Sequence, residues 1–470
     1  MEGNDISGLD LGKETWLTGF TSENINAKLA EWDSHNRNFP SDGHEYVVLP
    51  FYVNNSSGEK LLINDHENND GEAKLKTVTI NDYDGFSGQY CIQFSAARLL
   101  NRVLKAAGYR VVKNELIGTE WEKVCLFGKI ITLSHDVTPT WESTIELPGG
   151  VEISGSYLIK DSPYGDYLNY ADIVPDWDVD DFITKLKKLF CVTVDFDNKE
   201  KTVSVYFNKS IFLTDPIILK NEIGDPDHGE YDEQEGFELS VGSQDDSNAT
   251  LSNDDKYEDY AIFTNVDTYQ YLPGASNDYR NKAFYVKDTG RKYRCENDNG
   301  WKWKRIGRLE PYIEGEGENV KPIDVSIPQN VELGKIDVPY IQYSFPDDPE
   351  TFEDMGKLAF TFFQGLYTVN DVEYRILSAD RYSLDSLDTV FDFGKSLMPS
   401  YLYEQLYRQY LNWDTYRKRE FTKYFLMKLA DVVNLKWDQR YAIDGVAVIL
   451  NQKKFDLPYE GVVELNGYTL

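Results

Sequence analysis

Residues 402–450 carry the pattern that most restricts the fold of this chain, a helical repeat followed by β-type alternation. Leu402, Leu406 and Tyr410 recur at four-residue spacing, and Pro399 suits the first turn of such a helix. Beyond it, one side of a predicted strand is occupied by Phe421, Lys423, Phe425, Met427 and Leu429. Asp444-Gly445 then lies between two apolar runs and predicts a tight hairpin turn.

Composition and length extend the β prediction to the whole chain. Its 33 Tyr, 24 Phe and 9 Trp favour strands and extended contact surfaces over helix bundles, and 470 residues are too many for one core. We therefore expect a mainly β, multi-domain fold with small β-barrel or sandwich domains and α+β helix–hairpin units. The predicted domains are an N-terminal β region or arm at 1–90, an α+β module at 91–215, a β-hairpin domain at 216–345, and a C-terminal helix with a β-barrel at 346–470.

Local signals place the first helices and strands. Residues 94–108 form an apolar helical stripe that ends at Gly108, where a left-handed residue is favoured, and a strand follows. Asp178 suits the N-cap of a second helix, which leads into a hairpin that turns at 197–199. Nearer the N-terminus, Tyr46–Val53 predicts one strand and residues 54–58 the loop after it.

The net charge of −32 restricts the partners of the chain. A nucleic-acid-binding surface needs a basic stripe, and no such block of Lys and Arg is present. Acidity of this degree also repels anionic membranes. Residues 222–259 contain fourteen Asp or Glu and one Lys, which predicts a mobile acidic loop. A cation site there is the weaker interpretation, because the carboxylates follow no ligand spacing.

The cysteines and the N-terminus bear on the compartment. Cys91, Cys125 and Cys191 lie in apolar runs and predict buried free thiols, and Cys295 forms no metal motif with them. This pattern fits assembly in a reducing cytoplasm. No basic and apolar leader follows Met1, and no run reaches eighteen apolar residues. We therefore expect neither an export signal nor a membrane-spanning helix.

Residues 283–311 predict hairpins with one aromatic and one basic side. The aromatic positions are Tyr285, Tyr293, Trp301 and Trp303, and Lys302-Trp303-Lys304-Arg305 is the nearest approach to a basic patch. A sheet with one solvated side explains this alternation. A platform for a glycan or a protein partner is the other interpretation.

Motifs of catalysis are not found in the sequence. It has no nucleophile elbow, no glycine-rich phosphate loop and no paired zinc histidines. Ser134-His135-Asp136 contains the residue types of a catalytic triad, but neighbours in sequence cannot form the required hydrogen-bonded chain, so we interpret it as a turn. Residues 65–71 and 195–198 hint at calcium loops without the full ligand pattern, and 195–198 is better explained as a hairpin turn. We predict no enzyme, no cofactor and no metal.

Four segments appear in an order that is typical of one protein family. They are Ala107-Gly108-Tyr109 at a helix end, Val174-Pro175-Asp176-Trp177 with Phe182-Ile183 and Leu189-Phe190, the run Leu358–Gly365, and Leu429–Lys436 before Ile443-Asp444-Gly445. In this series the chain resembles the tail hub, or baseplate hub, proteins of phages and prophages of anaerobic gut bacteria, which are similar in role to late control protein D. The first 85 residues and residues 222–259 lie outside the resemblance.

The resemblance implies a structural virion protein. Hub proteins of this kind form a ring, usually a trimer, that connects the tail tube or neck to a spike or receptor-binding fibres and lines the DNA exit channel. The implied partners are further copies of the chain and the tube, spike and fibre proteins, and the implied location is the virion tail after assembly in the host bacterial cytoplasm. Closed rings use head-to-tail contacts, for which many Tyr and Trp are available.

Two other classes remain open at this point. A carbohydrate-binding or adhesive surface protein would use the Trp301 and Trp303 hairpin as its sugar platform. A tail-associated enzyme that cleaves peptidoglycan or capsule would need two carboxylates converging in a cleft, and among 80 acidic residues the sequence singles out none.

Overall fold

The computed structural model describes most of the chain. The described residues are 5–15, 21–41, 43–54, 60–78, 86–146, 150–161, 167–174, 177–229, 236–240, 276–280, 283–286, 291–297, 300–305, 312–315, 320–324, 332–333, 341–344, 360–369, 371–378, 382–384, 390–397, 399–437, 439–456 and 458–470. The remainder includes most of the predicted acidic loop and the first two residues of the resemblance segment Leu358–Gly365.

The chain is a multi-domain α+β protein that is mostly β, with one sheet curled into a half-barrel, as the composition predicts. It divides into two compact units, each assembled from three stretches of sequence. The first unit comprises Met1–Gly108, Thr119–Phe182 and Pro328–Ser396, and the second comprises Tyr109–Gly118, Ile183–Ile327 and Leu397–Leu470. None of these boundaries coincides with the sequence-based ones at 90, 215 and 345.

An eight-stranded sheet organises the first unit. Its strands pair in the order β2-β7-β9-β24-β25-β6-β5, and β10 pairs with β9. Their bounds are β2 (Tyr46–Val47), β5 (His66–Asn69), β6 (Glu72–Leu75), β7 (Phe86–Ser95), β9 (Val124–Glu146), β10 (Gly150–Asp161), β24 (Phe360–Val369) and β25 (Val372–Leu377). Helices α1 (Ser22–Asn38) and α2 (Ala96–Ala106) bury apolar faces in this unit, α2 through Leu99, Leu100 and Val103.

Smaller elements complete the first unit. They are η1 (Ile6–Gly8), β1 (Lys13–Thr15) paired with β11 (Tyr167–Asn169), α3 (Tyr170–Ile173), η2 (Glu120–Lys123), β26 (Tyr382–Leu384) paired with β27 (Val390–Asp392), and the sheet β22 (Glu332–Leu333), β23 (Ile341–Ser344), β3 (Phe51–Asn54) and β4 (Lys60–Ile63). The predicted single strand at 46–53 is therefore two strands in different sheets, separated by residues 48–50. Pro50, which has no N–H for a sheet ladder, lies in that break.

Two short motifs of the first unit differ from simple expectation. Ser134-His135-Asp136 lies inside the continuous strand β9, so the predicted turn is wrong. The backbone of His135 pairs with Phe86 on one side and Asp161 on the other. Residues 65–71, considered above as a calcium loop, contain β5 and the start of the β5–β6 turn, where Asn68 Oδ1 accepts a hydrogen bond from Gly71 N at 3.0 Å.

The helix–hairpin element at residues 179–207, most of which belongs to the second unit, follows the sequence closely. Helix α4 (Val179–Phe190) begins after Asp178, whose Oδ1 accepts a hydrogen bond from Asp180 N at 2.7 Å. Strands β12 (Val192–Asp197) and β13 (Thr202–Phe207) form the predicted hairpin, and Asp197 Oδ1 accepts hydrogen bonds from Lys199 N and Glu200 N across its turn. Strand β8 (Arg110–Asn114), which follows left-handed Gly108, pairs with β13 in parallel, and η3 (Asn208–Leu213) comes next.

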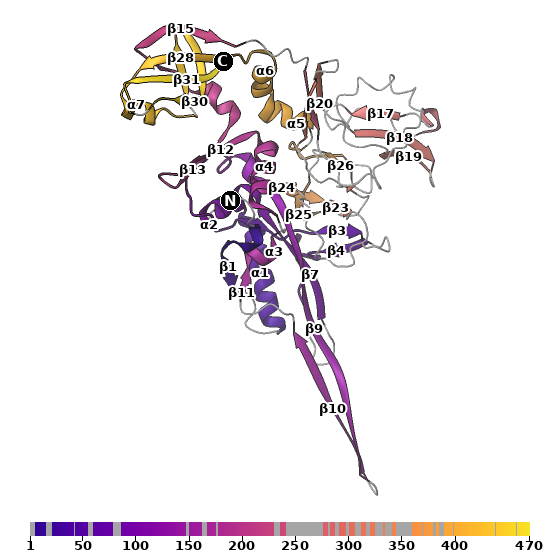
Figure 1. Ribbon diagram of the computed structural model, residues 1–470. Helices are drawn as coiled ribbons and strands as arrows, with labels where there is room; N and C mark the ends of the chain where they lie inside the picture. The colour runs from indigo at the N-terminus through magenta and orange to yellow at the C-terminus, as the bar shows by residue number, and fades with distance from the viewer. Residues whose placement is uncertain are drawn as a thin grey trace. The chain divides into compact units, whose positions relative to one another are not determined.

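A six-stranded sheet forms the C-terminal part of the second unit, in the order β14-β29-β30-β31-β28-β15 (Figure 1). Its strands are β14 (Ile217–Ile218), β15 (Glu222–His228), β28 (Glu420–Leu426), β29 (Arg440–Ile443), β30 (Val446–Lys454) and β31 (Val462–Thr469), with α7 (Leu429–Asn434) between β28 and β29. Asp444 and Gly445 form the predicted hairpin turn, with φ angles of 49° and 78°. The apolar core beside the sheet includes Phe421, Phe425, Val432, Tyr441 and Leu465.

Strand β15 corrects the prediction of a mobile acidic loop at 222–259. Its residues pair with β28, Glu222 with Phe425 and His228 with Phe421, so this part of the segment is an edge strand. The acidic composition does not prevent this, because the backbone supplies the hydrogen bonds of the ladder and exposed side chains stay hydrated. Strand β16 (Gly236–Ser240) lies between β20 (Tyr312–Gly315) and β21 (Val320–Asp324), and residues 230–235 and 241–259 lie outside the described residues.

The aromatic hairpin region of the second unit is a three-stranded antiparallel sheet. Its strands are β17 (Ala283–Val286), β18 (Arg291–Asn297) and β19 (Trp301–Arg305), preceded by η6 (Asn277–Tyr279). Among the described residues, no helix combines the length and the apolar character needed to cross a membrane.

Candidate functional site

The predicted C-terminal helix contains a wide turn that the sequence did not indicate. It starts at Pro399 as α5 (Pro399–Leu402), widens into a π-helical segment at Tyr403–Tyr407, and continues as α6 (Arg408–Tyr416). An α-helix brings every fourth residue to one face, whereas a π turn holds about one residue more and rotates the following side chains. Leu402 and Leu406 are buried as predicted, and Tyr403 and Tyr407 are buried with them. Such π segments are frequent at functional sites.

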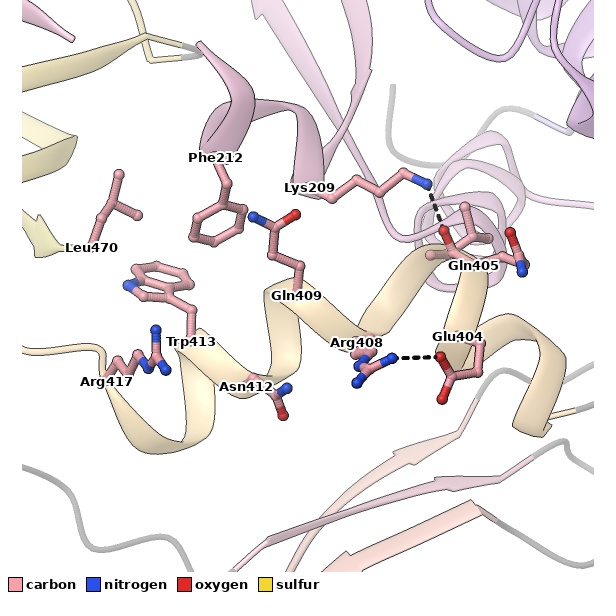
Figure 2. A pocket seen from close by; sticks show the side chains of 11 residues that line it. Lys209, Phe212, Glu404, Gln405, Arg408, Gln409, Asn412, Trp413, Arg417 and Leu470 are labelled. Atoms are coloured by element: carbon pink, nitrogen blue, oxygen red, sulfur yellow. Dashed lines mark hydrogen bonds and ion pairs between the residues drawn. The ribbon is translucent and has the colours of Figure 1, made fainter. Parts of the chain in front are cut away.

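A groove of about 600 Å³ runs along this helix, between it and η3 (Figure 2). Its lining residues come from η3, the π segment, α6 and the chain end, and are Lys209, Phe212, Glu404, Gln405, Leu406, Arg408, Gln409, Asn412, Trp413, Arg417 and Leu470. All of them belong to the second unit. The groove is large enough to hold a short peptide segment or a small ligand.

Cations exceed anions in the groove, in contrast to the chain as a whole. Among the lining side chains, Lys209, Arg408 and Arg417 are cationic and Glu404 is the one carboxylate. Arg408 Nη1 pairs with Glu404 Oε2 at 3.0 Å, and Lys209 Nζ donates a hydrogen bond to Gln405 O at 2.5 Å. The local excess of positive charge favours an acidic occupant.

An amide stripe follows one side of the helix within the groove. Gln405, Gln409 and Asn412 line it at helical spacing. The Oδ1 atom of Asn412 is buried and accepts no hydrogen bond from the described residues. Amide side chains both donate and accept hydrogen bonds, so this stripe suits the backbone of an extended peptide or the hydroxyl groups of a sugar.

Aromatic residues make one wall of the groove rigid. Trp413 is buried, donates its Nε1 hydrogen bond to Thr469 O at 2.6 Å, and contacts the ring of Phe212 edge to face at 5.6 Å between centroids. Tyr410 packs against Trp413 at 5.8 Å, and its burial raises the pKa of its hydroxyl. Lys418 lies over the ring of Tyr468 at 4.4 Å and pairs with Asp414. The wall is preformed, which lowers the entropic cost of binding.

The outer side of the six-stranded sheet presents a second surface, which we call the outer patch: Ile223, Tyr424, Leu426 and Val462. Ile223 pairs with Tyr424, and Leu426 pairs with Val462, so the four residues lie on one face. Each is between 41% and 54% exposed. Next to them, Tyr424 OH donates to Glu464 Oε2 at 3.0 Å and Lys454 pairs with Glu464 at 2.9 Å, which gives the patch a polar edge. An apolar patch with a polar rim is typical of protein–protein contact.

The four aromatic positions proposed from the sequence belong to β17, β18 and β19. The strand register places Tyr285 on a different face from the other three. Trp303 pairs with Cys295 and Trp301 with Asn297, which puts both on the same register face as Tyr293. Tyr293 pairs with Phe284, and Tyr285 pairs with Lys292, one position out of step. Cys295, opposite Trp303, is fully buried, and its thiol lies 3.5 Å from Ser276 O. The face is therefore covered by protein at Cys295, whereas Asn297, which pairs with Trp301, is exposed.

A buried polar cluster in the first unit has its hydrogen-bonding groups satisfied internally. The carboxylate of Glu14 accepts hydrogen bonds from Tyr46 OH at 2.8 Å and Tyr170 OH at 3.1 Å, and pairs with Lys28 at 2.9 Å. Burial raises the pKa of both tyrosine hydroxyls. The cluster therefore attaches β1 to the interior, and we assign it a structural role.

Two histidines and one aspartate of the first unit also have shifted pKa values. Burial lowers the pKa of His35, which stacks on Tyr46 at 4.1 Å, and that of His66, each to about 4. Burial also raises the pKa of Asp33 to about 6, although Leu75 N donates to its carboxylate. Among the described residues, no group of three or more His, Cys, Asp or Glu is arranged to hold a metal ion.

Comparison with known proteins gives no match: no family model, no curated protein and no solved structure is similar to this chain.

Neither surface was singled out from the sequence. The sequence did contain a signal for the outer patch, because Tyr424 and Leu426 alternate with the positions predicted to lie on the buried side of the strand. The groove gave no signal, since Lys209 and Phe212 join the helix from about two hundred residues earlier in the chain. The four cysteines are all buried and free, as predicted for three of them.

Proposed function

We propose that this chain is a structural virion protein, a tail or baseplate hub that forms a ring and connects the tail tube or neck to a spike or receptor-binding fibres. The sequence resemblance suggests this class, and the outer patch is the observation that best supports it. The C-terminal module that carries the last resemblance segment exposes four large apolar side chains on one sheet face. Such a surface is stabilised by contact with another protein chain.

The groove supplies a second kind of contact in this proposal. Its preformed aromatic wall, amide stripe and excess cations suit an acidic peptide segment of a neighbouring subunit. The chain itself is rich in such segments, at a net charge of −32. An apolar patch on one side of the module and a cationic groove elsewhere are different surfaces, and a head-to-tail ring uses two different surfaces at each contact.

The proposed ring lines the DNA exit channel, and its acidity is useful there. DNA is a dense polyanion, so an acidic lumen repels it and prevents it from binding to the wall. The proposal includes no catalytic residue and no cofactor. The protein would be assembled in the host cytoplasm, where free thiols stay reduced, and would reside in the virion tail.

A carbohydrate-binding function has less support. The Trp301 and Trp303 positions share a register face with Cys295, whose side chain is buried. A stacking platform requires an open aromatic face. Replacement of both tryptophans by alanine is expected to leave host adsorption unchanged in the hub account and to abolish glycan binding in the adhesive account.

The location of the protein in virus particles tests the proposal. Antibodies raised against the purified chain and labelled with gold should bind intact particles at one end of the tail, at the junction with the spike or fibres. Labelling of the capsid, or presence of the chain only in lysates and never in purified particles, would overturn the assignment. Two antibody fractions should be used, one that recognises the C-terminal sheet and one that recognises the rest of the chain. If one fraction labels the particles and the other does not, the second epitope is covered, whereas labelling by neither fraction indicates that the protein is absent.

A further inference from the structure

The groove beside the π segment and α6 contains a cation that has no ion-pair partner among the described residues. Arg417 is exposed at the Trp413 end of the groove (Figure 2). Its backbone N–H donates to Trp413 O at 3.0 Å, whereas its guanidinium is not within ion-pairing distance of any described carboxylate. The other two cations of the lining are engaged, Arg408 by a carboxylate and Lys209 by a backbone carbonyl. An unpaired guanidinium favours an occupant with a carboxylate, to which it can donate two hydrogen bonds.

The lining is also long enough for a short peptide in extended form. From Gln405 to Arg417 the helix rises by roughly 18 Å, at about 1.5 Å per residue, which equals the length of about five residues of a strand. Gln405 and Gln409 are exposed within this length, and the buried Oδ1 atom of Asn412 has no hydrogen-bond partner among the described residues. Amide side chains donate and accept, so they can bond both the N–H and the C=O groups of an extended backbone.

The aromatic wall of the groove favours a peptide over a sugar. A sugar ring stacks on an open aromatic face. Trp413 is only 5% exposed, and the rings of Phe212 and Tyr410 pack against it at 5.6 and 5.8 Å between centroids. The indole is therefore used within the protein, and the groups left for an occupant are amides and cations.

We propose that the groove binds an acidic peptide segment of a second copy of this chain, in extended form, with Arg417 pairing with a carboxylate and Gln409 bonding the backbone. The chain contains 80 Asp and Glu against 48 Lys and Arg, so another copy supplies acidic segments in excess. The inference deepens the proposed function and rests on it for the source of the peptide. The chemistry of the groove itself is independent of that function.

Local charge outweighs net charge at this site in physiological salt. The chain carries a net charge of −32 and repels an acidic peptide at low ionic strength. At about 0.15 M salt the screening length is about 8 Å, so carboxylates far from the groove contribute little. Within the groove, the lining side chains include three cations and one carboxylate. The affinity is therefore determined by the lining residues at this salt concentration.

A synthetic peptide and a matched pair of arginine variants test the proposal in the full chain. The probe is fluorescein-labelled Glu-Tyr-Asp-Glu-Gln-Glu, the sequence of residues 230–235, and its control peptide has Gln and Asn in place of Glu and Asp. Arg417→Gln removes the groove cation, and Arg419→Gln removes the same charge from an exposed position outside the lining. Fluorescence polarisation at about 0.15 M salt measures the affinity.

We expect Arg417→Gln to weaken binding of the probe about tenfold and Arg419→Gln less than about twofold, because a charge-assisted contact is lost only in the groove. Gln409→Ala should weaken binding about threefold, and the control peptide should bind at least about tenfold more weakly than the probe. Equal effects of the two arginine substitutions, or no binding of the probe to the parent chain, would overturn the proposal.

Light scattering of the parent chain with and without excess probe tests where the peptide comes from. A decrease in mass would support a second copy as the source, because the probe competes for the groove. Saturation of the groove with no change in mass would exclude a second copy. Failure of the hub assignment is distinguishable, since gold labelling of virus particles reports on it without reference to the groove.

Discussion

The six-stranded sheet and the paired strands β9 and β10 both alternate apolar and polar residues along the sequence, but they differ in how many strands pair beside them. On β28, Phe421, Lys423 and Phe425 are buried against residues of the same unit, including Val463 and Leu465. In β9 and β10, among the described residues, each strand beyond His135 pairs with the other alone. The difference teaches that alternation defines the two faces of a strand, whereas the residues that cover an apolar face come from distant parts of the chain.

The buried face of β28 also contains one charged side chain, which is tolerated there because two carboxylates lie close to it. Lys423 is 2% exposed, and its Nζ lies 2.7 Å from Asp444 Oδ2 and 3.4 Å from Glu222 Oε2. Its partners come from the hairpin turn and from the edge strand β15. The acidic residue Glu222 is therefore a structural partner of this face.

The largest expected effect comes from breaking the pairing that holds the covered sheet together. At Gly467 of β31, an added Cβ would lie 2.0 Å from the backbone oxygen of Ile449, so the β30–β31 pair cannot form unchanged. We expect Gly467→Ala to destabilise the second unit by about 4 kcal/mol or more. Gly8→Ala, where a Cβ meets nothing within 4 Å, is the control and should change stability by less than about 0.5 kcal/mol. Urea unfolding measures both variants, and a small change for Gly467→Ala would contradict the register.

A neighbouring pair of substitutions separates the two faces of β28. Phe425 is fully buried and Leu426 is 54% exposed. Phe425→Ala should cost about 3–5 kcal/mol because it leaves a cavity in the core, and Leu426→Ala should cost less than about 0.5 kcal/mol. Chemical denaturation with tryptophan fluorescence measures the difference. Similar costs for the two variants would mean that the faces are assigned wrongly.

Acid should destabilise the first unit through its buried histidines. Below pH 6.5 the unfolded chain protonates at His35 and His66, whereas the folded groups stay neutral down to about pH 4, so stability falls across this window. Asp33 acts in the opposite direction, since its folded pKa of about 6 favours proton uptake by the folded state between about pH 6 and pH 4. Two histidines outweigh one aspartate, and we expect each histidine to contribute roughly 1–2 kcal/mol at pH 5.

Thermal unfolding at pH 7 and pH 5 checks this prediction in the parent chain and in His66→Asn. The Nδ1 atom of His66 lies 2.6 Å from Asn64 O, and asparagine retains a donor for that contact. The variant should lose less stability on acidification than the parent does. An identical loss would show that His66 titrates as an exposed histidine.

The smallest effect on stability and the clearest effect on assembly are expected at the outer patch. A change of Leu426 to Lys adds charge to an exposed face, so the free energy of unfolding should change by less than about 0.5 kcal/mol. The same charge opposes burial against another chain, so higher-order species should decrease. Light scattering measures the change, and Thr422→Lys on the same face but outside the patch is the control. Unchanged assembly in Leu426→Lys would exclude the outer patch from the subunit contact.

Local patterns predicted much of the fold because their physical causes are local. Gly108 adopts the left-handed φ of 86°, Asp178 caps α4, and Asp444-Gly445 turns between β29 and β30. Features set by distant pairing could not be predicted this way. Acidic residues 222–228 become a strand because β28 offers an edge, and Ser134-His135-Asp136 is extended because β7 and β10 pair on both sides of it.

The candidate site shows the same limit. Leu402 and Leu406 were predicted on one face of the C-terminal helix, and both are buried. The π turn at Tyr403–Tyr407 was not predicted, because it packs against residues distant in sequence such as Phe237, whose ring centroid lies 5.5 Å from that of Tyr403. The aromatic hairpin was predicted correctly as strands, whereas the separation of Tyr285 from Tyr293 follows from the register in which β17 pairs with β18. Residue types indicate a strand, and pairing partners decide which residues share a face.

The absolute mass of the purified chain in solution, measured by light scattering with size exclusion and followed by negative-stain imaging of the main peak, tests the central claim most directly. The account predicts closed rings with a central channel and a mass of several times 54.2 kDa, three times for the expected trimer. A particle of 54.2 kDa at every concentration, with no ring in the images, would contradict it.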